Sequence, residues 1–173
     1  MDHTKTKIAR IKVDALYGKK KHFNAADRKE KLHYNIGNPI IILNIISGSV
    51  LFYVIKDGAS NLVKYIPLVL TLISTLLTAF QTHFNLAKKV EGHRRVGNKY
   101  LAIMKKCDRL QGYINDGFIS QNEIIDKLET ISKEIDDVNQ EAEAFPTNKV
   151  DYNLAQKGID SGEENYTEIE LNM

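Results

Sequence analysis

The residues of this chain that could do chemistry are hydroxyl and amide side chains set in a long uncharged run. Within residues 66–84 they recur every three or four positions, so on a helix they share one face. Polar groups in an apolar helix either hydrogen-bond to a neighbouring helix or face a wet passage. Spacing alone favours hydrogen bonds between helices. If the face is wet, the candidate pore-lining residues are Thr71, Thr75, Thr78, Gln81, Thr82 and Asn85, with Ser74 beside them.

A second uncharged run, residues 39–55, carries Asn44, Ser47 and Gly48 within an isoleucine-rich sequence. Small and hydroxyl side chains let two helices approach closely and hydrogen-bond to one another. We predict that these three residues pack the first run against the second.

Catalytic and cofactor motifs are missing from the sequence. The ten glycines form no dinucleotide-binding motif and no phosphate loop, and the H-E-x-x-H zinc motif does not occur. Cys107 is the one cysteine and cannot build a zinc site from cysteine pairs. His83 and His93 lie too far apart to form a local ligand pair on one helix. We expect no enzyme activity, no cofactor and no metal site.

The two uncharged runs must form the elements that position these side chains. Residues 39–55 would reach roughly 26 Å as a helix and residues 66–84 about 28 Å, close to the ~30 Å hydrocarbon core of a bilayer. Asn38 as N-cap and Pro39 as first helical residue would start the first helix, and the turn residues of 56–61 would reverse the chain. The sequence predicts a transmembrane helical hairpin. The alternative, two buried helices of a soluble bundle, is disfavoured because a basic cluster adjoins each run.

Charge is distributed unevenly along the chain, although the total is only +2. Residues 1–37 contain ten basic and four acidic residues, and residues 85–100 contain five basic residues and one acidic residue. The segment between the two runs offers two lysines and one aspartate. By the positive-inside rule, both termini lie in the cytoplasm. Residues 101–173, with seven basic and sixteen acidic residues, then form an acidic cytoplasmic segment.

Residues 4–36 of this N-terminal segment, 1–37, lack helix breakers other than Gly18, and their apolar residues recur with an imperfect helical period. We predict a basic amphipathic helix, with a break at Gly18 left open, that lies on anionic lipid headgroups or packs on its neighbours. Nucleic acid could attract the same charge. The adjacent membrane span makes anionic lipid the simpler partner, and no direct binding of nucleic acid is expected.

Residues 85–145 are predicted to form two helices separated by a turn at 115–117. Ser120 and Glu123 have the spacing of a capping box at the start of the second helix. That helix carries a heptad seam made of Ile124, Leu128, Ile131, Ile135 and Val138. The seam could join copies of the chain as a coiled coil or pack on the preceding helix, and its spacing does not separate these. Pro146 ends the helix, and residues 146–173 are predicted to be a partly disordered tail.

The order of these segments, with local sequence patterns, resembles the SLATT proteins. The patterns are A-R-I-K-V-D-A-L at 9–16, Gly37-Asn38-Pro39, F-N-L-A-K-K-V-E-G-H-R-R-V-G-N-K-Y at 84–100, Phe145-Pro146 and V-D-Y-N-L-A at 150–155. SLATT proteins are two-transmembrane effectors of bacterial conflict systems linked to nucleotide signalling and reverse transcriptases. The resemblance implies an all-α membrane protein that forms homo-oligomers and permeabilises the inner membrane in antiphage defence, causing abortive infection. It also implies a trigger, either a nucleotide second messenger or a sensor protein, and it favours a pore for the polar face.

A function of another class stays open. The swing from the basic residues 85–100 to the acidic residues beyond them would also suit a non-conducting membrane scaffold. In that case the acidic cytoplasmic helix would recruit a soluble partner by charge complementarity.

The predicted topology can be tested with reporter fusions. Alkaline phosphatase, which is active only in the periplasm, should be inactive at either terminus and active when inserted between the two uncharged runs. A fluorescent protein that matures only in the cytoplasm should give the opposite pattern. Periplasmic activity at either terminus would contradict the assignment.

Overall fold

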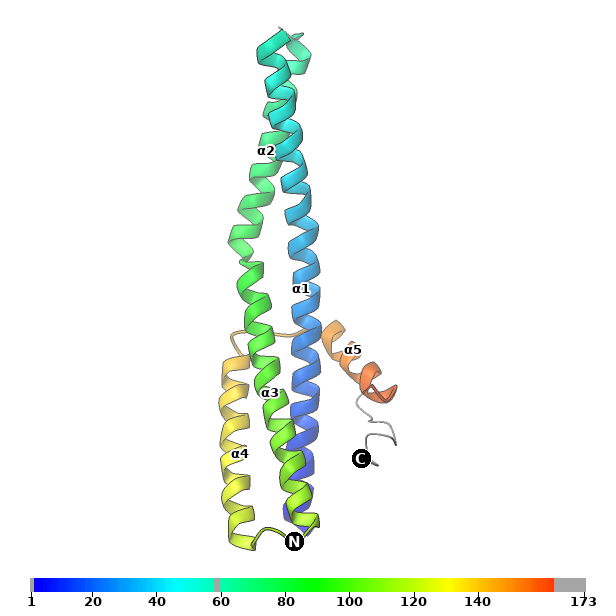
Figure 1. Ribbon diagram of the computed structural model, residues 1–173, viewed down its shortest axis with the longest axis vertical. Helices are drawn as coiled ribbons and strands as arrows, with labels where there is room; N and C mark the ends of the chain where they lie inside the picture. Colours follow the sequence, from blue (N-terminus) through cyan, green and yellow to red (C-terminus); the bar gives the residue numbers. More distant parts are fainter. Residues whose placement is uncertain (1, 58–59, 164–173) are drawn as a thin grey trace. The chain divides into compact units, whose positions relative to one another are not determined.

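The chain forms five α-helices in the residues that the structure, a computed structural model, describes, which are 2–57 and 60–163. They are α1 (Asp2–Asp57), α2 (Asn61–Phe84), α3 (Leu86–Asn115), α4 (Gln121–Ala142) and α5 (Lys149–Asp160) (Figure 1). No strand occurs among these residues, so the all-α prediction is confirmed. The helices form two compact units. Unit 1 combines the chain up to Ala26 with the chain from Glu91 on, and unit 2 is Asp27–Val90.

Unit 2 contains the helical hairpin of α1 and α2, and its apolar side chains lie on the outside. Phe52 is 70% exposed and Leu62 80%, whereas Ser47 and Ser74 are 8% and 4% exposed. The most apolar windows of the two long helical segments are only 6% and 11% buried, and both segments are long and apolar enough to cross a membrane. This arrangement differs from the buried core helices of a soluble bundle and suits helices surrounded by lipid.

The helix that contains the first span does not begin at Asn38, because α1 runs from Asp2 to Asp57 with Pro39 inside it. The predicted N-cap at Asn38 is wrong, and no break occurs at Gly18. A proline removes one backbone hydrogen bond and crowds the preceding turn. Transmembrane helices tolerate this where the freed backbone groups find other partners. The helix therefore continues through a residue that would end many helices in water.

The second span does not run on unbroken into the next helix. α2 ends at Phe84, Asn85 adopts the left-handed conformation (φ 45°, ψ 51°), and α3 starts at Leu86. Asparagine is one of the few residues besides glycine that enters this conformation at low cost. The N–H of Asn85 still donates to the carbonyl of Gln81 (3.0 Å). The chain thus passes from one helix to the next while this backbone donor keeps a partner.

Unit 1 holds the apolar core. The turn between α3 and α4 contains Gly117 at φ 71°, and α4 starts with the predicted Ser120–Glu123 capping box, which is confirmed. The heptad residues are buried in one cluster with residues of α3 and of the start of α1. They are Ile124, Leu128, Ile131, Ile135 and Val138. The seam therefore packs within the chain, and its use between copies stays a prediction.

Ion pairs align α4 with α3 on the outside of this core. Glu141 accepts hydrogen bonds from Lys99 and from Arg95 Nε (2.8 Å), and Glu134 pairs with Lys106. The bond from Lys99, followed by the bond from Arg95, lowers the pKa of Glu141. Because these pairs join the C-terminal half of α4 to α3, the ion pairs and the apolar seam specify the same alignment of the two helices.

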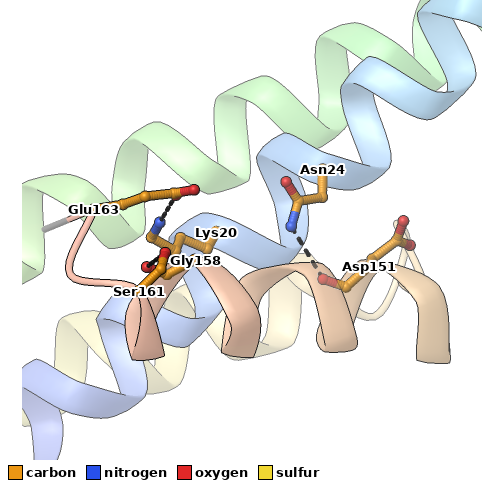
Figure 2. Close-up of polar contacts among 6 residues, drawn as sticks. All are labelled: Lys20, Asn24, Asp151, Gly158, Ser161 and Glu163. Atoms are coloured by element: carbon orange, nitrogen blue, oxygen red, sulfur yellow. Dashed lines mark hydrogen bonds and ion pairs between the residues drawn. The ribbon is translucent and has the colours of Figure 1, made fainter.

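Helix α5 lies in the region predicted to be a partly disordered tail. It starts with a second capping box, between Asn148 and Asp151, and it lies against α1 (Figure 2). Three contacts hold it there: Asn24 Nδ2 donates to the Asp151 carbonyl (3.1 Å), Lys20 Nζ pairs with Glu163 Oε2 (2.5 Å), and the rings of Tyr17 and Tyr152 stack 5.8 Å apart. The last part of this predicted tail, residues 164–173, lies outside the described residues.

Aromatic rings sit directly on glycines where the segments of unit 1 meet. Gly92 of α3 receives the ring of Phe145, and Gly18 of α1 receives the ring of Tyr100. A Cβ atom at Gly92 would lie 2.0 Å from Cε1 of Phe145, and one at Gly18 would lie 2.8 Å from Cδ1 of Tyr100. A single added methyl group would therefore force either ring out of its place.

Gly92→Ala should destabilise unit 1 by about 1–3 kcal/mol, the usual cost of overpacking a tight site. The thermal midpoint of the detergent-solubilised chain should fall accordingly. Gly112→Ala on the same helix is the control, because a Cβ atom there meets nothing within 4 Å and alanine favours a helix over glycine by about 1 kcal/mol. Equal midpoints for the two variants would show that the Phe145 ring does not depend on Gly92.

Candidate functional site

The candidate site is a groove on the hairpin of unit 2, with a volume of about 670 Å³. One residue of α1 and one face of α2 line it: Asn44, Thr71, Ser74, Thr75, Thr78, Ala79, Thr82 and His83. Four of the six predicted pore-lining residues are threonines of this wall. We call it the hydroxyl groove.

Two hydroxyls of the groove hold the hairpin together. Ser47 Oγ donates to the carbonyl of Pro67 (3.2 Å) and lies 3.0 Å from Thr71 Oγ1. Because the single hydroxyl proton of Ser47 is used on Pro67, Thr71 must be the donor to Ser47. Ser74 Oγ donates to Asn44 Oδ1 (2.7 Å). The predicted packing residues Asn44 and Ser47 thus meet α2 through its polar face.

Other hydroxyls bond to their own helix. Thr75 Oγ1 donates to the carbonyl of Thr71 and Thr78 Oγ1 to that of Ser74, each over 2.8 Å. The hydroxyl protons are then occupied, so these side chains present oxygen lone pairs and methyl groups to the groove. Such a wall accepts hydrogen bonds from water and offers no charge.

The remaining predicted residues lie elsewhere. Gln81 Nε2 donates to the carbonyl of His33 (2.8 Å) and thereby joins α2 to α1 without lining the groove. Asn85 forms the C-cap of α2. A Cβ atom at Gly48 would meet nothing within 4 Å, so this glycine is not at the contact between α1 and α2. Sequence spacing could not separate these three roles, because all of them suit small or polar residues in an apolar run.

Sequence reasoning missed a buried histidine pair in unit 1. Nδ1 of His22 in α1 lies 3.1 Å from Nδ1 of His93 in α3, and both residues are buried. The ring of Tyr100 packs 5.8 Å from that of His22. Burial, then the neighbouring His93 and Lys21, lowers the pKa of His22 to about 4, while Asp151 acts in the opposite direction. The two histidines are far apart in sequence, so no local signal could have paired them.

Metal-binding and nucleophilic chemistry receive no support from the described residues. No group of three or more histidine, cysteine, aspartate or glutamate residues that could hold a metal occurs among them. Cys107 is buried, and burial followed by the charge of Asp108 raises its pKa to about 11. The thiolate needed for a nucleophile is therefore disfavoured at neutral pH.

Comparison with protein families gives a match that covers almost the whole chain. A sequence model described as "SMODS and SLOG-associating 2TM effector domain family 4" matches residues 5–170. Comparisons with curated proteins and with solved structures give no match.

The His22–His93 pair predicts acid sensitivity of unit 1. The pKa of His22 is about 6.5 in an unfolded chain and about 4 in the fold, so the unfolded state takes up the proton first as the pH falls. The stability is intact above pH 6.5 and should decline by about 2 kcal/mol between pH 6.5 and 4, after allowance for solvent screening.

Denaturant titrations at pH 7.0 and 5.0 can measure this decline. His22→Asn keeps a hydrogen-bonding group near the position of Nδ1 but cannot titrate, so its midpoint should change less with pH. His3→Asn, at an exposed histidine outside the pair, is the matched control. A pH dependence of His22→Asn equal to that of the natural chain would exclude the pair as its source.

Proposed function

The chain belongs to the SMODS and SLOG-associating 2TM effector domain family 4, a family of two-transmembrane effectors, and we propose that it acts by opening a pore in the bacterial inner membrane. The membership confirms the SLATT resemblance and the two-transmembrane hairpin, and makes the chain a membrane effector. The proposal adds that copies of the chain form the pore together, and that the resulting loss of membrane potential stops growth of an infected cell.

The observation that carries the proposal is that the residues of the hydroxyl groove have two roles: some bond across the hairpin, and others only line the groove. Thr71 and Ser74 supply hydrogen bonds between the two helices of the hairpin. Thr75, Thr78 and Thr82 are not needed for those bonds, and yet they line the same open groove. Polar side chains within a membrane usually face protein or water rather than lipid. We therefore infer that these three threonines line a water-filled passage between copies of the chain.

In the proposed assembly, several hairpins stand side by side with their grooves facing a common axis. Their exposed apolar residues, such as Phe52 and Leu68, then face lipid. Gly48 leaves its backbone open to close approach by a neighbouring hairpin. The lumen has no fixed charge, so it would select weakly among ions. Since Thr75 and Thr78 present lone pairs, it should favour cations over anions.

The surroundings of the pore follow from the charge distribution. We place both termini in the cytoplasm, where the basic residues at 1–37 and 85–100 meet anionic headgroups. Opening would be controlled from this side, by a nucleotide or by a sensor protein acting on the helices of unit 1.

One observation favours a second candidate function, a non-conducting scaffold. Helix α4 leaves several carboxylates exposed while its apolar face is buried: Asp126, Glu129, Asp136 and Asp137. Such a face would suit a basic soluble partner. Induced expression with a potential-sensitive dye separates the two functions, because a scaffold leaves the membrane potential unchanged.

Thr75→Leu and Thr78→Leu should abolish depolarisation, because leucine side chains would replace the hydroxyls that keep the lumen wet. Each hairpin should stay intact, since the bonds of Ser47 and Asn44 between α1 and α2 are untouched, so oligomers detected by crosslinking should persist. Thr71→Val should instead weaken the packing of α1 on α2 within the hairpin, by roughly 0.6 kcal/mol for the bond lost.

Val69→Leu is the matched control, because it introduces the same residue at an exposed position of α2 outside the groove. It should leave both depolarisation and oligomers intact. If Thr75→Leu and Thr78→Leu lose oligomers in step with activity, the threonines are packing residues and the pore assignment fails.

A further inference from the structure

A second groove lies between α3 and α4 in unit 1, with a volume of about 310 Å³. This is the lower end of the size range of small-molecule sites, which is roughly 300–1,000 Å³. Its walls contain Lys106, Arg109 and Tyr113 of α3 and Lys127 of α4, and its floor contains Leu110 and Ile131. We call it the basic groove.

The basic groove is lined by three cations and by no carboxylate. Lys106 forms an ion pair with Glu134. Within the part of the chain that the structure describes, neither Arg109 nor Lys127 forms an ion pair. Glu123, one turn before Lys127, forms its hydrogen bonds with Ser120; these bonds lower its pKa most, and the nearby charge of Lys127 lowers it further without an ion pair. Two cations from two helices are therefore available to one anionic ligand.

The rest of the groove suits a flat apolar group. Leu110 and Ile131 are buried in the core, so they form a fixed floor. Tyr113 is 46% exposed and stands one helical turn beyond Arg109 on the same face of α3. An aromatic ring that enters the groove can stack on Tyr113 while its anionic end reaches Arg109.

Thr130 completes the wall but supplies no donor. Its hydroxyl donates to the carbonyl of Asp126 (2.9 Å). Its oxygen can accept a hydrogen bond, for example from a sugar hydroxyl or an amino group. The charged donors for the anion are therefore the side chains of Arg109, Lys127 and Lys106.

We propose that the basic groove binds a nucleotide, with its phosphates on Arg109 and Lys127 and its base on Tyr113. Inorganic phosphate would use the cations but leave the apolar floor and the tyrosine without a role. A neutral aromatic compound would leave the cations unused. A nucleotide has both parts in one small molecule.

Such a ligand would contact α3 and α4 at once and so stabilise their packing, by an amount that grows with its concentration. That this changes conduction rests on the proposed pore function. The binding itself does not, because it involves unit 1 alone.

Binding to the purified full-length chain in detergent tests the proposal. Isothermal titration without divalent cations should detect saturable binding of at least one of ATP, GTP, CTP and UTP, and about tenfold weaker binding of pyrophosphate, which lacks the base. Arg109→Gln and Lys127→Gln should each weaken the binding of both the nucleotide and pyrophosphate about tenfold. Tyr113→Leu should weaken only the nucleotide. Lys133→Gln, at an exposed lysine of α4 outside the groove, is the control and should change neither.

Two results would overturn the nucleotide site. One is the absence of saturable binding of all four nucleotides. The other is binding that pyrophosphate matches and Tyr113→Leu leaves unchanged, which would make the groove a general anion site. Recording the membrane potential in cells that express the natural chain separates the two proposals. Nucleotide binding without any depolarisation by the natural chain would reject the pore and retain the site.

Discussion

Every polar group in the hairpin must find a hydrogen-bond partner within the protein, because hydrocarbon offers none. An unsatisfied group there costs several kcal/mol. The hairpin meets this requirement in two ways: Ser47 and Asn44 bond across to α2, and Thr75 and Thr78 bond to their own helix. The arrangement of unit 2 depends on these hydrogen bonds. Its outer surface is apolar, and in a lipid environment the hydrophobic effect does not press one helix against the other. The polar bonds therefore determine which faces of α1 and α2 meet.

Because of the same requirement, helix packing and the proposed conduction are not exclusive roles for the polar face of α2. Thr71 is committed to Ser47 and yet lines the groove with Thr75, Thr78 and Thr82. One edge of the groove belongs to the contact within the hairpin, and the rest is open. A face that is bonded along one edge and wet along the other can serve both roles when copies assemble. Packing within unit 1 points the same way, because the heptad seam is already covered by α3. Assembly through the hairpins needs no exposed seam, whereas a coiled coil between copies would require α4 to leave its own core.

Sequence reasoning predicted the features that local residues decide. The two spans follow from uncharged runs, and the start of α4 follows from Ser120 and Glu123, which lie three residues apart and bond to each other. It failed at Pro39 and at Asn85 because the local preference was opposed by context. A proline preceded by asparagine favours a helix start in water, but α1 continues through it. Asn85 suits a helical polar stripe equally well as a left-handed cap, and only the structure distinguishes them.

The features that the sequence did not predict depend on contacts between distant segments. Helix α5 has 12 residues, too few to be stable alone in water. Its ordering comes from Tyr17, Lys20 and Asn24 of α1, which precede it by more than a hundred residues (Figure 2). The same stretch of α1 supplies His22 to the histidine pair and Gly18 to the ring of Tyr100. Residues 17–24 thus contact α3 on one side and α5 on the other. The packing of this stretch therefore depends on segments that lie far along the chain, which local sequence patterns do not reveal.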